Sequence, residues 1–244
     1  MQEKIQKLAH ILKETKNMVF FGGAGVSVAS NIPDFRSSTG LFQEKGAVPP
    51  EDILSRSYFD KHPEEFYRFY KTKMVYPEAR PNPAHDALAE LEAMGKLKAV
   101  ITQNIDNLHQ MSGSKNVIEL HGTVLTSYCL KCRKTYTLEY ILKSEGVPYC
   151  DCGGLIKPDV VLYEEPLSSE ALERSLSYLA AADTLLVAGT SLLVNPAAGL
   201  VRYFSGDNFI IINKGKTPYD AYADLVIHGD VAIVLPEALL LSKE

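Results

Sequence analysis

The four cysteines of the sequence are its most specific candidates for chemistry, because all of them fall within residues 129–152. They form two close pairs, Cys129-x-x-Cys132 and Cys150-x-Cys152, which are separated by an arm of 17 residues (133–149). This spacing is typical of a zinc ribbon, in which each pair places two thiolates on one side of a tetrahedral ion. Because four thiolates close the coordination shell, the pattern predicts a structural zinc ion. Two disulfides and four free thiols are the alternatives.

A glycine-rich segment is the second candidate for chemistry. An apolar run at residues 18–21 leads directly into GGAG (22–25), and the backbone N–H groups of such a loop can approach a pyrophosphate closely. The strict G-x-G-x-x-G pattern fails, because Val28 stands at its last position and the next strand is expected only near residue 98. The segment therefore predicts a phosphate-binding loop and disfavours an ordinary dehydrogenase.

Polar residues and glycines also follow later apolar runs, at the points where these runs end. The runs lie at residues 98–102, 117–120, 184–188, 209–212 and 225–227. Runs that are apolar on both faces suit buried parallel strands, and ligands of a parallel sheet bind outside the carboxyl ends of its strands. The same residue types are also common in turns. However, six strands that end in this way predict a shared polar cleft.

Helical patterns separate several of the apolar runs. Residues 5–12, 85–94 and 168–182 carry apolar side chains at helical spacing. Strands that alternate with helices imply an α/β fold with a doubly wound parallel sheet. Two stretches interrupt this order: residues 30–84, expected to form a loop and a small helical insertion, and residues 124–165, which hold the cysteines. Aromatic residues at near-helical spacing predict a packed helix face at Phe66, Tyr67, Phe69 and Tyr70.

The composition restricts the class of protein. The chain has 244 residues, of which 46% are apolar and 23% are charged, and this excludes a disordered chain, a coiled coil and a collagen-like fibre. A net charge of −5 leaves no broad basic surface for nucleic acid. No apolar run approaches the roughly 20 residues of a membrane helix, and the N-terminus lacks the apolar centre of a signal peptide. We therefore expect a cytoplasmic protein without membrane or nucleic-acid partners, and nothing demands more than a monomer.

Several motifs occur in a fixed order along the chain. They are GAGVSVASNIPDFR (23–36), TQNIDNLHQ (102–110), HG (121–122), the four cysteines, GTS (189–191) and IIN (211–213). Together they resemble the sirtuin family of NAD-dependent protein deacylases. The resemblance extends from about residue 10 to about residue 235. The chain resembles the bare catalytic core of bacterial members of the family.

The resemblance implies one sirtuin-type catalytic domain over residues 1–244. Its large, Rossmann-like lobe would comprise about residues 1–29, 85–123 and 166–244. Its small lobe would combine the helical insertion at about 30–84 with the zinc ribbon at about 124–165. NAD and an acetyl-lysine peptide would then enter the cleft between the lobes from opposite sides.

The resemblance also implies the site residues. His121 and Asn104 would be catalytic, and the cysteines Cys129, Cys132, Cys150 and Cys152 would hold the zinc ion. The implied NAD-binding residues are Ala24, Gly25, Ser27, Val28, Phe35, Arg36, Gln103, Asn104, Ile105, Asp106, His121, Gly189, Thr190, Ser191, Asn213, Asp230 and Val231. The peptide would add as a strand between Val160, Val161, Leu162 and Tyr163 on one side and the loop with Val194 and Asn195 on the other.

The implied reaction is lysine deacetylation. The carbonyl oxygen of acetyl-lysine would attack the nicotinamide ribose, with release of nicotinamide, and the products would be O-acetyl-ADP-ribose and deacetylated lysine. Imidazole suits the general base that activates a ribose hydroxyl, since its ordinary pKa is about 6.5, and His121 is the candidate. Two alternatives are a mono-ADP-ribosyltransferase on the same scaffold and a non-enzymatic zinc-ribbon binding module. His121 and TQNID (102–106) disfavour the second alternative but do not exclude the first.

Some positions depart from the family pattern. Asn31 and Asn107 stand where the family usually has glycine, and we expect a positive φ at both, which Asn tolerates best among non-glycine residues. Tyr163-Glu164-Glu165 replaces the usual Phe-Gly-Glu. Family members that prefer acidic acyl chains carry Tyr and Arg where this sequence has Tyr67 and Tyr70. Without that arginine a succinyl carboxylate lacks its bidentate partner, so we predict a preference for acetyl or other uncharged acyl groups.

Overall fold

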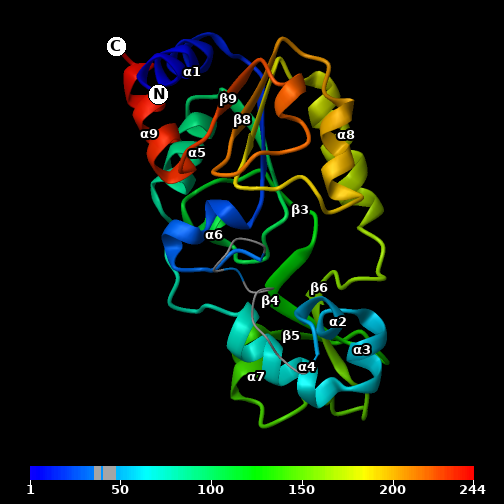
Figure 1. Cartoon of the computed structure of the whole chain (residues 1–244). Helices are drawn as coiled ribbons and strands as arrows, with labels where there is room; N and C mark the ends of the chain where they lie inside the picture. Colours follow the sequence, from blue (N-terminus) through cyan, green and yellow to red (C-terminus); the bar gives the residue numbers. More distant parts are fainter. Residues whose placement is uncertain (36–39, 41–47) are drawn as a thin grey trace.

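The protein is known here from a computed structural model, which describes residues 1–35, 40 and 48–244. Figure 1 shows a larger lobe, which contains both chain ends, and a smaller lobe beneath it. Among the described residues, six strands form the sheet of the large lobe in the order β3-β2-β1-β7-β8-β9, and every neighbouring pair is parallel. The strands are β1 (Met18–Gly22), β2 (Leu97–Thr102), β3 (Val117–Glu119), β7 (Thr184–Ala188), β8 (Asn208–Ile212) and β9 (Leu225–Ile227).

This strand order confirms the predicted doubly wound sheet. The order reverses at β1, which pairs with β2 on one side and with β7 on the other. In open α/β sheets, such a switch point opens a crevice at the carboxyl ends of the strands. The polar residues that follow the strands therefore meet at one edge, as the sequence predicts.

Helices cover both faces of the large sheet (Figure 1). Successive strand residues point to opposite faces, so Phe20 packs in one apolar cluster and Phe21 in the other. Both side chains are completely buried. The first cluster is closed by α1 (Gln2–Glu14), α5 (Pro83–Ala93) and α9 (Val231–Leu241), and the second by α8 (Ser169–Ala181) and the 3₁₀ helix η5 (Ala197–Tyr203).

The starts of two of these helices follow from their sequences. Asn82 caps α5, where its Oδ1 accepts a hydrogen bond from Ala84 N at 3.0 Å, and Pro83 occupies the first helical position. Ser168 caps α8 by accepting a hydrogen bond from Ala171 N at 3.3 Å. The helices predicted at 85–94 and 168–182 are thereby confirmed, with bounds shifted by one or two residues.

The small lobe combines an antiparallel sheet with short helices. Within the described part of the chain its strands run in the order β5-β4-β6. The strands are β4 (Gly122–Cys129), β5 (Thr135–Thr137) and β6 (Ile156–Val160). The helices are α2 (Pro50–Ile53), α3 (Arg56–Lys61), α4 (Pro63–Phe69), the π-helical turn η4 (Tyr70–Met74) and α7 (Leu138–Lys143).

An aromatic core joins the helical insertion to the cysteine-bearing sheet. Phe66 and Tyr67 meet edge to face with ring centroids 5.5 Å apart, and Phe66 stacks on Tyr70 at 5.8 Å. Tyr67 Oη donates a hydrogen bond to the carbonyl oxygen of Ile156 on β6 at 2.5 Å. The predicted aromatic helix face is confirmed, and it packs against the small sheet.

The remaining short elements lie in the large lobe. They are the 3₁₀ turns η1 (Ala24–Val26), η2 (Val28–Ser30) and η6 (Asp220–Tyr222) and the helix α6 (Leu108–Met111). Across residues 1–35, 40 and 48–244, we find no helix with the length and apolar content needed to cross a bilayer.

Candidate active site

A cavity of about 900 Å³ opens at the carboxyl ends of the large sheet and extends to β6 of the small lobe. Its lining includes every residue predicted to bind NAD or peptide except Arg36. Arg36 lies outside the described residues. The structure therefore brings together residues that come from seven separate stretches of the sequence, from the glycine segment to the start of α9.

The glycine segment after β1 packs directly against the turn after β7. Gly25 N donates a hydrogen bond to Gly189 O at 2.8 Å, and a Cβ added to Gly25 would lie 2.7 Å from Gly189 Cα. Gly189 has a φ of 60°, a left-handed conformation that glycine adopts without strain. Because only backbone fits between the two segments, their main chains meet at the rim of the cavity.

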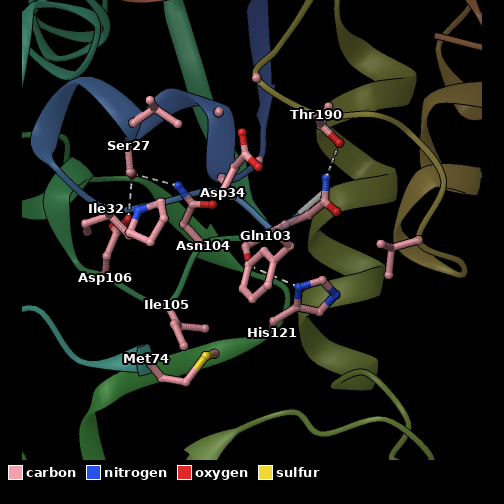
Figure 2. Close-up of a pocket in the computed structure, with 18 of the residues that line it drawn as sticks. Ser27, Ile32, Asp34, Met74, Gln103, Asn104, Ile105, Asp106, His121 and Thr190 are labelled. Atoms are coloured by element: carbon pink, nitrogen blue, oxygen red, sulfur yellow. Dashed lines mark hydrogen bonds between the residues drawn. The ribbon is translucent and has the colours of Figure 1, made fainter. Parts of the chain in front are cut away.

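A buried network connects the glycine segment with the residues after β2 (Figure 2). Ser27 Oγ donates to Asp106 Oδ2 at 2.6 Å and accepts from Asn104 Nδ2 at 2.9 Å. Asn104 N donates to Thr102 Oγ1 at 3.0 Å, and Asp106 Oδ1 accepts from Leu108 N at 3.0 Å. The amide and the carboxylate are therefore fixed in orientation before any ligand binds.

Two asparagines give this region its turns. Asn31 has a φ of 63° at the end of η2, and Asn107 has a φ of 65° just before α6. The predicted positive φ at both positions is confirmed.

His121 follows β3 and contacts the backbone of the preceding strand end (Figure 2). Its Nδ1 lies 3.0 Å from the carbonyl oxygen of Gln103. A carbonyl oxygen only accepts hydrogen bonds, so Nδ1 carries the proton and Nε2 keeps its lone pair. Burial lowers the pKa of His121 below its ordinary value of 6.5, and the hydrogen bond to Gln103 opposes this only in part. The imidazole is therefore neutral at pH 7 and has the lone pair of a general base.

The main chain of His121 also contacts the small lobe. Its carbonyl oxygen accepts a hydrogen bond from Val161 N at 2.9 Å, and the next residue, Gly122, pairs with Val160. Gly122 has a φ of 75°, and a Cβ there would overlap the carbonyl oxygen of Asp159. The candidate base is thus fixed relative to the segment predicted to bind peptide.

Polar contacts also link the strand ends at the other side of the cavity. Gln103 Nε2 donates to Thr190 Oγ1 at 3.0 Å, which connects the end of β2 with the turn after β7. Asp230 caps α9 by accepting from Ala232 N at 3.0 Å and pairs with Lys214 at 2.8 Å. Asn213 donates from Nδ2 to Gly215 O at 2.9 Å.

The four cysteines converge at one end of the small sheet. The Sγ atoms of Cys129 and Cys152 are 3.5 Å apart, as are those of Cys132 and Cys150, and all four Sγ atoms lie within 4.8 Å of one another. A disulfide requires sulfurs about 2.05 Å apart. A tetrahedral zinc ion with Zn–S bonds of about 2.3 Å places its sulfurs about 3.8 Å apart. The tetrad therefore fits one structural zinc ion.

His109 does not reach the cavity lining, although it belongs to the TQNIDNLHQ motif. It packs between the rings of Phe20 and His85, with centroid distances of 5.9 and 4.8 Å. Burial, followed by the neighbouring His85, lowers its pKa to about 3. His109 is therefore a buried packing residue of the large lobe.

Sequence reasoning missed Asn82. Its Nδ2 donates to the carbonyl oxygen of Val26 and to Ser30 Oγ, both at 2.8 Å, and so holds the segment after β1 against α5. The signal was present, because an asparagine before a proline is typical of a helix start.

Comparison with known proteins shows which family this chain belongs to. Residues 23–196 match the Sir2 family. An NAD-dependent protein deacetylase of Clostridium perfringens is 55% identical over 243 residues, which cover 98% of this chain and 100% of that protein. A structure described under the mechanism and regulation of Sir2 enzymes has a TM-score of 0.92 and 41% identity, and covers 100% of this chain and 99% of the other. A Sir2 variant with deacetylated p53 peptide and 3′-O-acetyl ADP-ribose has a TM-score of 0.89 and 41% identity, with 97% of each chain covered.

Proposed function

Because this chain belongs to the Sir2 family and is an NAD-dependent protein deacetylase, we propose that His121 is the general base of its reaction. One observation carries this proposal. A neutral imidazole, with Nδ1 bonded to the Gln103 carbonyl and Nε2 free to accept a proton, lines the same cavity as the glycine segment and the small-lobe strand.

The enzyme transfers the acetyl group of an acetylated lysine to the ADP-ribose part of NAD, with consumption of one water molecule and release of nicotinamide and the free lysine amine. Bound NAD supplies the electrophilic anomeric carbon that the acetyl oxygen attacks. Asn104 and Asp106, held through Ser27, order the pocket around this carbon, and Ile105 and Asp106 hold the carboxamide. His121 Nε2 then takes the proton of a ribose hydroxyl, so that the hydroxyl oxygen attacks the acetyl carbon.

The other residues predicted to bind NAD divide between the two ends of the dinucleotide. The phosphates contact Ala24, Gly25, Ser27 and Val28. Arg36, which the resemblance also assigns to NAD, lies outside the described residues. Phe35 shields the nicotinamide side, and Gln103 holds ribose hydroxyls. The adenosine half contacts Gly189, Thr190, Ser191, Asn213, Asp230 and Val231. The position of the four residues assigned to the phosphates, in the cavity lining directly after β1, supports this placement.

The substrate is an acetyl-lysine peptide, which adds as a strand in the cleft. Its partners are Val160, Val161, Leu162 and Tyr163 on one side and Val194 and Asn195 on the other, all in the cavity lining. Tyr67 and Tyr70 are each only 1% exposed and belong to the aromatic core. Neither residue provides a cation for a succinyl carboxylate, and this supports a preference for acetyl groups.

The small lobe and its zinc ion complete a single catalytic domain. Cys129, Cys132, Cys150 and Cys152 hold the ion, which fixes the ribbon from which β6 and the peptide-binding strand extend. With no open coordination position, the metal takes no part in the chemistry.

The test is product analysis with the purified protein, NAD and an acetyl-lysine peptide. We expect deacetylated peptide and O-acetyl-ADP-ribose in equal amounts by mass spectrometry, and slower turnover of the matching succinyl peptide. ADP-ribose attached to protein, with the acetyl group left in place, would instead support a mono-ADP-ribosyltransferase. A protein that consumes no NAD would contradict both enzymatic functions.

A further inference from the structure

The segment predicted to bind peptide, residues 160–163, is followed by a residue in a backbone conformation that its side chain does not favour. β6 ends at Val160, and the chain continues through Leu162 and Tyr163 to Glu164. Glu164 has a φ of 76°, in the left-handed region where a Cβ crowds the following carbonyl oxygen. Asparagine tolerates this region, but glutamate lacks the short side chain that permits it. Contacts elsewhere must therefore hold Glu164 in place.

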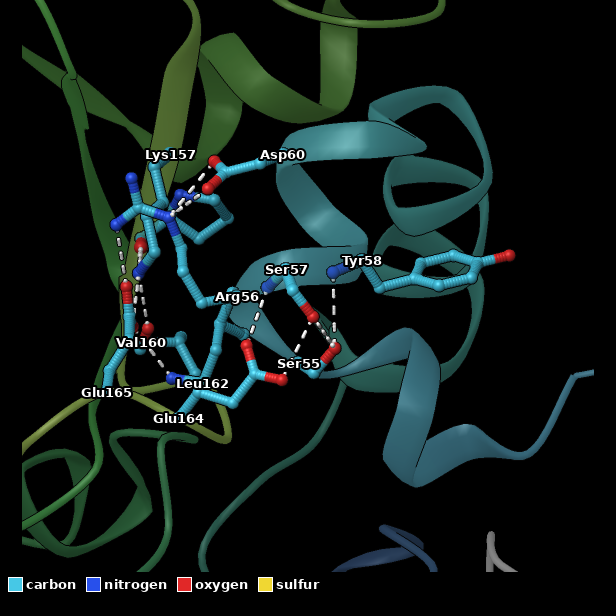
Figure 3. Close-up of polar contacts among 11 residues, drawn as sticks. Ser55, Arg56, Ser57, Tyr58, Asp60, Lys157, Val160, Leu162, Glu164 and Glu165 are labelled. Carbon is cyan, nitrogen blue, oxygen red and sulfur yellow. Dashed lines mark hydrogen bonds and ion pairs between the residues drawn. The ribbon is translucent and has the colours of Figure 1, made fainter.

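The contacts of Glu164 lead to the start of α3 (Figure 3). Its carboxylate accepts two hydrogen bonds from one residue, from Ser57 N at 2.8 Å and from Ser57 Oγ at 2.9 Å. The main chain of Tyr163 adds two more, because Tyr163 N donates to Leu54 O and Arg56 N donates to Tyr163 O, each at 3.0 Å. These four bonds fasten the residues that follow β6 to the helical insertion.

Glu165 is held by a second set of donors (Figure 3). Its Oε2 accepts from Leu162 N at 2.9 Å and pairs with Lys157 Nζ at 3.0 Å, and its Oε1 accepts from Arg56 at 3.1 Å. The Lys157 side chain is only 2% exposed, and its Nζ also donates to Val160 O at 2.8 Å. Burial alone would raise the pKa of Glu165, but Leu162 N and Lys157 lower it below its ordinary value of 4.5. Glu165 is therefore ionised at neutral pH.

We propose that Glu164 and Glu165 form a carboxylate clamp, which positions residues 160–163 for the incoming peptide. The inference deepens the proposed function and rests on it, because that function assigns residues 160–163 to the peptide. A peptide that adds as a strand needs backbone N–H and C=O groups already in register. His121 O and Gly122 hold the near end of this segment, and the clamp holds the far end. Glu164 and Glu165 are thus positioning residues for peptide binding.

The kinetic test uses Glu164→Gln and Glu164→Gly. The first variant weakens the contacts to Ser57, and the second removes them and relieves the backbone strain. We expect the KM for acetyl-lysine peptide to rise about five- to tenfold for Glu164→Gly and less for Glu164→Gln, while kcat and the KM for NAD change less than about twofold. Asp60→Asn is the matched control, because Asp60 pairs with Arg56 Nε at 3.0 Å, whereas Glu165 accepts from Arg56 Nη1. An unchanged peptide KM, or an equal rise in the NAD KM, would overturn the clamp.

Hydrogen exchange separates this proposal from the proposed function. The clamp should protect the amides of Leu162 and Tyr163, so Glu164→Gly should speed their exchange without affecting the amides of β1. Unchanged exchange overturns the clamp whatever the protein catalyses. A wild-type protein that leaves NAD and acetyl peptide intact overturns the proposed function and the peptide-positioning role together, even if exchange shows that the two glutamates hold the segment. Glu165→Gln leaves Lys157 buried without an anion; if this variant fails to fold, the Glu164 variants decide.

Discussion

At the carboxyl ends of β1 and β7, two stretches of backbone meet with no side chain between them, and Gly25 N bonds directly to Gly189 O. At the far end of the cavity, the segment after β6 is held instead by charged side chains. There Glu165 joins Lys157 and Arg56, which lie 8 and 109 residues away along the chain. One side of the cavity is shaped by the close approach of two glycine-containing backbones, and the other by ion pairs of the small lobe, whose sheet also carries the four cysteines.

The difference matters for how each side responds to change. A glycine contact tolerates no added atom, because both partners are backbone and neither can move aside. An ion-pair contact depends on ionisation and on its partners, so a change to one partner leaves the other unsatisfied. We therefore expect added side-chain volume to damage the nucleotide side, and the loss of a charge or of the metal ion to damage the small lobe.

The largest expected effect is the loss of zinc. Cys150→Ser, or removal of the ion by a chelator, should unfold the small sheet, because a structural zinc ion contributes about 10 kcal/mol or more to the fold that binds it. Deacetylation should disappear. NAD binding should weaken less, because the large sheet has its own apolar clusters. Metal analysis should give one zinc ion per chain, and far-UV circular dichroism should retain the helices of the large lobe. Complete unfolding of both lobes would show that the two sides are not independent.

His121→Ala removes the proposed base, which contacts Gln103 of the large lobe and Val161 after β6. We expect kcat to fall by about 10²- to 10⁴-fold, the range in which a positioned general base contributes. Binding of NAD and the melting temperature should change little. His10→Ala, an exposed change on α1, is the matched control. Deacetylation that survives His121→Ala at a normal rate would show that the base assignment is wrong.

The pH dependence follows from the lowered pKa of His121. Burial lowers this pKa below 6.5, against the hydrogen bond to Gln103, so the base stays neutral above that pH. We expect kcat/KM to be flat above pH 6.5 and to fall about tenfold per unit once the pH drops below the pKa of the folded protein. Stability has the same sign, because the unfolded chain takes up the proton first. A pH–rate profile checks this, and an acid limb centred above 6.5 would contradict the burial argument.

A methyl group at Gly189 tests the nucleotide side by volume. Gly189→Ala adds a Cβ at a φ of 60° that overlaps the backbone of Val26. It should lower the free energy of unfolding by roughly 2–4 kcal/mol and raise the KM for NAD. Gly146→Ala is the matched control, since Gly146 has a φ of 61° and open space around it. This control should lose only about 1–2 kcal/mol from backbone strain. Equal losses in thermal melts would mean that the close backbone approach contributes nothing.

The same contrast explains what could be predicted from the sequence. The parallel strands, the polar cleft, the thiolate tetrad and the positive φ of two asparagines all follow from local patterns, because each depends on residues close in the chain or on a recognised motif. The assignments of individual residues to NAD, peptide and zinc stay predictions until ligands are observed, as do a cytoplasmic location and a monomeric state.

The sequence could not reveal the contacts of the small lobe. Nothing near Lys157 indicates that its ammonium is buried against Glu165, and nothing near Ser57 indicates that it binds Glu164. The Ser57–Glu164 contact requires α3 to pack against the segment after β6, and the Lys157–Glu165 pair requires that segment to turn back onto β6, so no local pattern predicts either one. Asn82 lies between these two cases. The sequence indicates that it caps a helix, but nothing in the sequence indicates its contact with Val26.

The smallest expected effect concerns Asn107, where the family usually has glycine. Its φ of 65° places it in the left-handed region, and among the described residues its side chain caps nothing at the start of α6. If only the backbone conformation matters there, Asn107→Gly should change kcat/KM less than about twofold and stability by less than about 1 kcal/mol. Asn107→Val should be clearly worse, because a β-branched residue is strained at this φ. Parallel kinetics and thermal melts of the two variants would decide. If Asn107→Gly were as damaging as Asn107→Val, the asparagine side chain itself would be needed, and backbone geometry alone would not explain the nucleotide side of the cavity.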